Sequence, residues 1–287
     1  MGVLSEQRWR VRQREHVARV RRWTDPYQRR RSRGEKHPVH DFLFQYYPHR
    51  PAHLERWSPG PGVVLTGAAS EFLERPGFTT TRDGVALAPF PARRAPATRA
   101  LLALLEATAS RAPRLSCFGL HEWAMVYRQP PERVRHSQLP LRLGSAGTDT
   151  VVESLELRCG HVDAFRFFTG PARPRNALQP SRERQVELEQ PGCLHANMDL
   201  YRAAFKLDPY VPSELVADCF ELAVGLRELD MRASPYDLSG LGYEPVRIET
   251  PRGRAEYARA QADFAERAQP LRERLIEHCR GLLAQVQ

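Results

Sequence analysis

Apolar side chains recur at helical spacing in several segments of the chain. In residues 189–205 a Pro-Gly turn precedes a helix that we expect to begin near Cys193 and to end before Asp208. One face of that helix carries the apolar residues Leu194, Met198, Tyr201 and Phe205. Residues 98–105 predict a core helix, and residues 212–226 predict another. Residues 251–284 predict a long surface helix that is interrupted at Pro270.

Shorter runs predict a small β component. Residues 63–65 are strand-like, and residues 79–87 predict a hairpin around Asp83 and Gly84. Residues 139–144 and 151–158 alternate between apolar and polar side chains as strands do. We therefore expect a mainly α fold with a small β component (α+β). Residues 37–287 would form a single helix-rich globular domain.

The net charge of +9 is concentrated at the N-terminus. Residues 1–36 hold twelve Lys or Arg against four acids, which gives +8, so the remaining 251 residues sum to +1. Arginine-rich segments commonly lie along phosphate backbones. We expect residues 1–36 to form a basic arm that contacts DNA, and a solvated run of charge is the alternative.

The remaining composition excludes several classes of protein. Five cysteines without a Cys-x-x-Cys signal neither a disulfide framework nor a structural zinc site. No apolar run approaches the roughly 20 residues of a membrane span. We expect a cytoplasmic protein that does not contact a membrane. Lys36 and Lys206 are the two lysines, so any Schiff-base chemistry must use one of them.

Histidine and a carboxylate occur together, beside aromatic residues, at four places: His40-Asp41, His121-Glu122, His161 with Asp163, and His195 with Asp199. The last pair is spaced i and i+4, so its side chains project together from one helix. We expect some of these pairs to converge on one buried site, with His195 and Asp199 at its floor. The alternative for each pair is a helix cap or a core hydrogen bond.

Glu122 lies in an almost wholly apolar run, residues 117–128. An unpaired buried carboxylate costs several kcal/mol, so Glu122 needs a partner. The candidates are Arg128, a distant histidine or a metal ion. Residues 230–238 form a polar segment that we expect to be a turn.

These histidines lie in longer runs, residues 37–44, 118–128, 161–169 and 189–195, and residues 230–238 form a fifth run. The five runs resemble a family of bacterial proteins commonly labelled 3-methyladenine DNA glycosylase, and the similarity spans roughly residues 35–270. The sequence does not resemble the helix-hairpin-helix or other well-understood alkylpurine glycosylase folds. The resemblance implies a DNA repair enzyme that flips an alkylated purine out of the duplex and hydrolyses its N-glycosidic bond.

Under this reading, Asp199 or Asp163 orients the attacking water and His195 assists the carboxylate. Glu122 is a further catalytic candidate. The base would stack on aromatic rings, and Arg232 is an additional substrate-binding candidate. The candidate rings are Trp123, Tyr127, Phe165 and Phe167. We expect no cofactor, and a monofunctional reaction without strand cleavage through a Schiff base.

The alternative is a helix-rich metalloenzyme, either a non-haem iron oxygenase or a metal-dependent hydrolase, in which case the glycosylase label is an inherited error. Imidazole and carboxylate together suit iron, zinc or manganese. The candidate ligands are His121, Glu122, His161, His195 and Asp199. A third reading is a nucleic-acid-binding accessory protein without catalytic activity.

Overall fold

The computed structural model describes residues 2–134 and 136–286. It confirms the mainly α fold with a small β component, because helices make up 57% of the chain and a four-stranded sheet 6%. The chain forms two compact units. Unit 1 comprises Met1–Ala103, Leu200–Glu221 and Leu271–Gln287, and unit 2 comprises Leu104–Asp199 and Leu222–Pro270. No helix in the described ranges has the length and apolarity that crossing a membrane requires.

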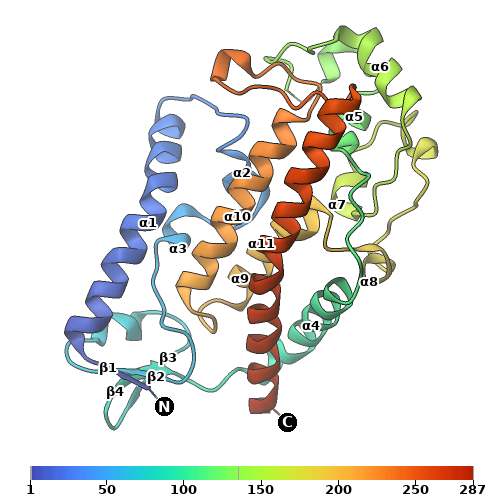
Figure 1. Cartoon of the computed structure of the whole chain (residues 1–287). Helices are drawn as coiled ribbons and strands as arrows, with labels where there is room; N and C mark the ends of the chain where they lie inside the picture. The colour runs from blue at the N-terminus through green and yellow to red at the C-terminus, as the bar shows by residue number, and fades with distance from the viewer. Residues whose placement is uncertain (1, 135, 287) are drawn as a thin grey trace. The chain divides into compact units, whose positions relative to one another are not determined.

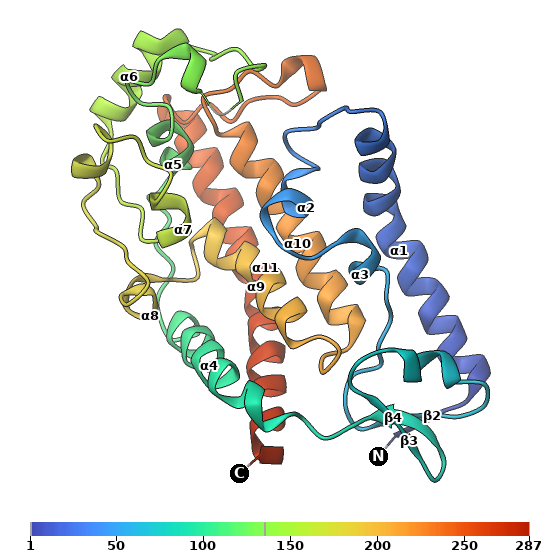
Figure 2. The ribbon, with the colours of Figure 1, turned by 180° about the vertical axis from the view of Figure 1, so that it is seen from behind.

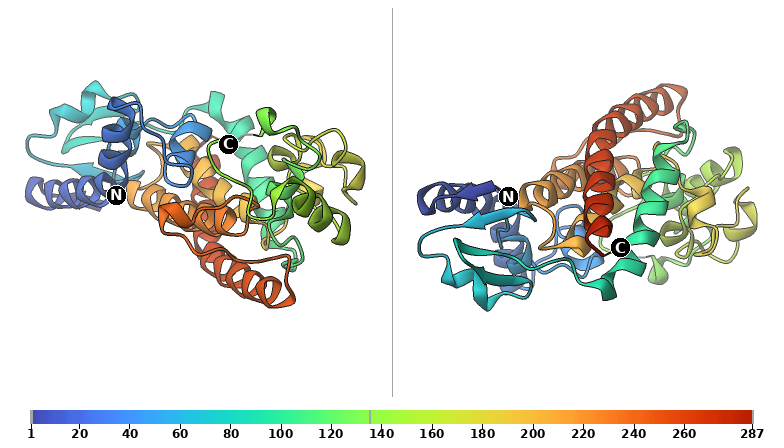
Figure 3. Two further views of the ribbon diagram at one scale, coloured as in Figure 1. Left: turned by 90° about the horizontal axis from the view of Figure 1, so that it is seen from above. Right: turned by 90° about the horizontal axis from the view of Figure 1, so that it is seen from below.

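Unit 1 contains the sheet, whose strand order is β1-β2-β4-β3 (Figure 1). β1 (Gly2–Leu4) runs parallel to β2 (Val63–Leu65), and β4 (Gly84–Leu87) pairs antiparallel with both β2 and β3 (Phe78–Thr81). The strand at residues 63–65 and the β3–β4 hairpin are therefore confirmed. Figure 3 shows the sheet beside the first turns of α1 (Glu6–Ser32), where Trp9 packs edge-on against Phe72.

The segment expected to form a basic arm is the long helix α1. Trp9, Val20 and Tyr27 are buried in unit 1, because apolar residues recur at helical spacing between the arginines. Arg12 and Arg19 form ion pairs with Glu214, Asp218 and Glu221, at 2.5 to 2.9 Å. Two short helices, α2 (Phe42–Tyr46) and α3 (Pro51–Leu54), complete the N-terminal part of the unit. The DNA contact stays a prediction.

Unit 2 contains the short helices α5 (Leu120–Ala124), α6 (Gly144–Ser154), α7 (Val162–Phe165) and α8 (Gln185–Leu188), which Figure 2 shows. The strands predicted at residues 139–144 and 151–158 are wrong. The first half of the second run lies in α6, and the β-type pairing of these two runs is limited to single bridges at Leu141 and Leu157. Thr148, Val151 and Val152 are all buried, at the i, i+3, i+4 spacing of one helical face. The strand prediction rested on Val151, Leu155 and Leu157, which would share one face of a strand.

Four longer helices contribute residues to both units: α4 (Ala95–Ala109), α9 (Leu194–Leu207), α10 (Ser213–Arg232) and α11 (Pro251–Leu283). They confirm the helices predicted in these segments. Two details differ. α11 continues through Pro270 and buries Tyr257, Gln261 and Arg272, so it is neither interrupted nor purely a surface helix. α10 extends to Arg232, so the start of the predicted polar turn belongs to this helix.

A candidate metal centre in unit 2

Three of the four histidine pairs meet in unit 2. The ring centroids of His121 and His195 are 4.6 Å apart, and those of His195 and His161 are 5.2 Å apart. All three side chains are buried. The predicted convergence is confirmed for these three histidines. His40 and Asp41 belong to unit 1, where Asp41 accepts a hydrogen bond from Arg30.

Local backbone features position the rings. His195 lies in the first turn of α9, directly after a tight turn at Gly192. A Cβ at Gly192 would lie 2.5 Å from the carbonyl oxygen of Arg114, so this position requires glycine. His121 lies in α5, which follows two residues with positive φ, Phe118 at 48° and Gly119 at 70°. His161 immediately precedes α7.

A buried chain of charged groups holds His121. Its Nε2 donates to Asp230 Oδ1 at 2.7 Å, and Asp230 Oδ2 accepts from Arg227 Nη1 at 3.1 Å. The same Arg227 nitrogen donates to Glu122 Oε1 at 2.8 Å. The partner that the buried Glu122 needs is therefore Arg227. Arg128, the partner considered from sequence, pairs with Glu153 instead.

The electrostatics assign different charges to the two neighbouring rings. Burial lowers the pKa of His195 well below its usual value, and the charge of His121 lowers it further, so His195 is neutral. Burial also disfavours a charged His121, but the charge of Asp230 and its hydrogen bond outweigh this and raise the pKa of His121 well above its usual range. Glu122 has a pKa of about 2, because Arg227 outweighs the effect of burial.

The neutral His195 faces a carboxylate and a second imidazole. His121, His195 and Asp230 each offer one ligand atom, and these three atoms lie within 4.8 Å of one another. We call these three residues the ligand cluster. A neutral imidazole whose nitrogen lone pair is available is the form that binds metal ions.

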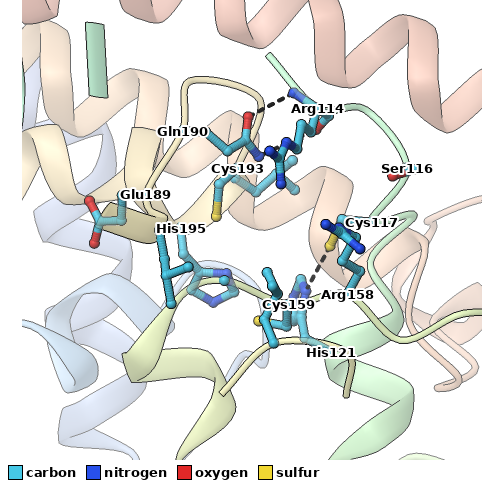
Figure 4. A pocket seen from close by; sticks show the side chains of 14 residues that line it. Arg114, Ser116, Cys117, His121, Arg158, Cys159, Glu189, Gln190, Cys193 and His195 are labelled. Carbon is cyan, nitrogen blue, oxygen red and sulfur yellow. Dashed lines mark hydrogen bonds between the residues drawn. The ribbon is translucent and has the colours of Figure 1, made fainter. Parts of the chain in front are cut away.

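A small pocket opens onto the ligand cluster, and Figure 4 shows His121 and His195 on its wall. Its volume is about 40 Å³, room for a few water molecules, each of which needs about 10–15 Å³. The other lining side chains include Cys117, Cys159, Cys193, Arg114, Arg158 and Gln190. Cys117 Sγ lies 3.8 Å from His121 Nδ1, the ring nitrogen that faces away from Asp230. The pocket therefore combines thiols, imidazoles and two cationic side chains.

The expected base-stacking rings do not line this pocket. Trp123 is fully buried and its Nε1 donates to the carbonyl oxygen of Ala233, while the hydroxyl of Tyr127 donates to Glu153. Phe165 is buried against Phe168. Phe167 is 38% exposed and also lies outside the pocket. Arg232, the additional substrate-binding candidate, donates to the carbonyl oxygen of Glu244 and does not line the pocket either.

Two predicted carboxylates pair with other residues. Asp163 binds Arg182 at 2.5 Å and lies 3.7 Å from Arg166, which accounts for its burial. Asp199 Oδ2 lies 3.5 Å from His161 Nε2. Asp199 is thus adjacent to the third histidine, whereas Asp230 supplies the carboxylate of the ligand cluster.

Several residues of the site were missed from sequence: Asp230, Arg227, Glu189 and the three pocket cysteines. A usable signal existed for two of them. Arg227 and Asp230 are charged residues at i, i+3 spacing within a helix that is otherwise apolar on that side, which indicates a buried ion pair. Glu189 and the cysteines come from separate loops and helix ends, so only the tertiary fold brings them together.

No family model, curated protein or solved structure matches this chain. The resemblance to the glycosylase family therefore stays a prediction.

Proposed function

We propose that the protein is a metal-dependent enzyme, in which His121, His195 and Asp230 bind a divalent transition-metal ion. The observation that carries this proposal is the buried, neutral His195 beside an imidazole and a carboxylate, all within 4.8 Å. Two histidines and one carboxylate are a common ligand set for iron(II) and zinc. Three protein ligands leave further coordination positions open for a reactant.

The surrounding hydrogen bonds support this assignment. Metal-binding histidines are usually held through their second ring nitrogen, and metal-binding carboxylates through their second oxygen. Here His121 Nδ1 faces Cys117 and Asp230 Oδ2 accepts from Arg227. Binding at His121 Nε2 would displace the proton that this nitrogen shares with Asp230, so metal affinity should weaken as the pH falls.

The pocket restricts the reactants. A volume of about 40 Å³ admits water or dioxygen at the ion, and Arg114 and Arg158 favour a small anionic substrate. With a bound metal, water would become a nucleophile at neutral pH, or dioxygen would be activated. The identity of the ion separates these two chemistries, because iron favours an oxygenase and zinc a hydrolase.

The first test is the metal content of the purified full-length protein, measured by inductively coupled plasma mass spectrometry. We expect at least one equivalent of iron or zinc per chain. His195→Gln should weaken binding of the same ion by about 100-fold or more. His40→Gln in unit 1 serves as the matched control and should retain the metal. A metal-free protein that binds neither ion, or a His195→Gln variant with unchanged affinity, would contradict the proposal.

The glycosylase activity remains the competing prediction. The measurement that distinguishes it is release of 3-methyladenine from alkylated DNA, with and without a metal chelator. We expect no release that survives chelation. Chelator-resistant release that is lost in Asp199→Asn or Asp163→Asn would favour the glycosylase, because both carboxylates lie outside the ligand cluster.

A further inference from the structure

Unit 1 contains a pocket of its own. Its volume is about 300 Å³, at the lower end of the roughly 300–1,000 Å³ that small-molecule sites occupy. One face of α1 lines it, because Gln13, Val17 and Arg21 follow one another at i, i+4 and i+8. The other lining residues come from the segments 52–57 and 71–75. All of them belong to unit 1, whereas the ligand cluster belongs to unit 2.

The buried part of this lining is apolar, and the rest is charged. Trp57 and Phe72 are each 1% exposed, and their rings pack edge-on with centroids 6.1 Å apart. Charges beside such an apolar surface are screened less than charges in open water, so they attract a ligand more strongly. The charged lining consists of three arginines and two glutamates: Arg21, Arg56, Arg75, Glu55 and Glu71.

Both glutamates of the pocket have partners other than Arg56 and Arg75. Glu55 Oε2 accepts a hydrogen bond from Arg21 at 3.3 Å, and its Oε1 accepts one from the hydroxyl of Thr24. The second acid of the lining, at position 71, pairs with an arginine of α1 outside the pocket at 3.5 Å. The negative charges of the lining are therefore directed to α1.

Arg75 is a fixed cation of the pocket without a counter-ion. Its Nη1 donates to the carbonyl oxygen of Trp57, and its guanidinium lies 5.5 Å from the ring centroid of Phe72. Burial lowers the pKa of Arg75, and the charge of Asp208 offsets this effect only in part. Within the described residues, neither Arg75 nor Arg56 forms an ion pair. Two guanidinium groups of the pocket thus lack a paired negative charge.

We propose that this pocket binds a small phosphorylated molecule, whose phosphate group is held by Arg56 and Arg75. A guanidinium matches the geometry of phosphate and can donate two parallel hydrogen bonds to it. Two cations without a counter-ion favour a dianionic phosphate ester over a carboxylate with a single charge. The volume leaves room for an organic group beside the phosphate. This binding function goes beyond the metal chemistry proposed for unit 2.

Isothermal titration calorimetry of the full-length protein at physiological ionic strength tests this proposal. The probe is phenyl phosphate, and benzoate presents a carboxylate on the same ring. We expect saturable binding of phenyl phosphate and at least about tenfold weaker binding of benzoate. Arg75→Gln should weaken binding of phenyl phosphate by about tenfold or more, and Arg56→Gln should also weaken it. The matched control is Arg82→Gln, an exposed arginine of unit 1 outside the pocket, which should bind like the wild type.

The contrary outcomes are distinct. No saturable binding of phenyl phosphate at millimolar concentration would overturn the proposal. Binding that Arg158→Gln weakens, and that Arg56→Gln and Arg75→Gln leave unchanged, would assign the phosphate to the pocket of unit 2 instead.

Two further comparisons test the kind of ligand. Equal affinity for benzoate would overturn the choice of a phosphate group. Binding of a DNA oligonucleotide without binding of phenyl phosphate would overturn the choice of a small molecule. Circular dichroism of each variant checks folding, and the exposed Arg56 keeps the test decisive if Arg75→Gln misfolds.

Discussion

His195 is the residue on which the metal proposal depends, because burial and the charge of His121 lower its pKa and leave it neutral beside His121 and Asp230. Burying a polar ring costs free energy that a bound metal ion would offset. Asp230 has the opposite character, since it is fully buried and pairs with both His121 and Arg227. The two residues should therefore respond differently to substitution in the metal-free protein.

We expect His195→Leu to leave the unfolding free energy of the metal-free protein unchanged within about 1 kcal/mol, or to raise it, because the substitution replaces a buried polar ring by an apolar side chain. Asp230→Asn should lower it by about 3 kcal/mol, because Arg227 and His121 lose their buried counter-charge. The measurement is urea denaturation in the presence of a chelator, with the exposed Asp263→Asn as control. Equal losses in both variants would mean that His195 has only a structural role.

His49 in unit 1 provides a prediction about pH. Burial, followed by the charges of His53 and Arg56, lowers the pKa of His49 to about 4. The unfolded chain therefore takes up a proton near pH 6.5 that the folded chain does not. The contribution to stability is complete above pH 6.5 and falls by up to about 3 kcal/mol as the pH drops to 4.

This dependence is measured by urea denaturation of the wild type and His49→Gln between pH 4 and pH 8. The stability of the wild type should fall more steeply with acid than that of the variant. Parallel curves would show that His49 is protonated as readily in the folded protein as in the unfolded chain.

At the scale of elements, α1 shows that charge along the sequence does not determine exposure. The arginines were read as an arm because they are dense, yet Trp9, Val20 and Tyr27 form a buried stripe between them. Arg19 contacts Asp218 and Glu221, while Arg29, Arg31 and Arg33 are exposed near the end of the helix. A DNA contact would therefore use the exposed end of α1.

We expect Arg19→Ala to lower the unfolding free energy by about 1 kcal/mol, because it breaks half-exposed pairs with two acids. Arg29→Ala should change stability by less than about 0.5 kcal/mol. If the basic segment binds DNA, fluorescence anisotropy at several salt concentrations should show weaker binding and a shallower salt dependence in Arg29→Ala. A triple variant in which Arg29, Arg31 and Arg33 are replaced by alanine gives the decisive comparison. If its DNA affinity equals that of the wild type, this basic segment does not bind DNA.

The sequence predicted correctly those elements whose apolar residues follow a single period, either that of a helix or that of a strand. α9 and α10 have a single helical stripe, and the β3–β4 hairpin has a turn that determines its register. α6 was assigned incorrectly because Val151, Leu155 and Leu157 fit one face of a strand, whereas the buried face of the helix is formed by Thr148, Val151 and Val152. Pro270 was read as a break, yet α11 continues through it, since proline removes one hydrogen bond without preventing the surrounding packing.

At the scale of the whole molecule, composition and periodicity predicted the helical fold class, and the two compact units were not anticipated. Each unit is assembled from separate stretches of the chain, and α9, α10 and α11 each contribute residues to both units. Such long-range arrangement leaves no local pattern in the sequence. For the same reason, only part of the candidate site could be predicted from the sequence. The pairing of histidine with acid residues indicated His121, His161 and His195, whereas Asp230 joins them only through the tertiary packing of α10 and α5.

The most direct test of the metal centre is anomalous X-ray diffraction from crystals of the full-length protein, measured on both sides of the absorption edge of the metal found in it. We expect an anomalous peak about 2.0–2.2 Å from ligand atoms of His121, His195 and Asp230. An ordered water without anomalous signal at this position, or a metal peak bound by other residues, would contradict it.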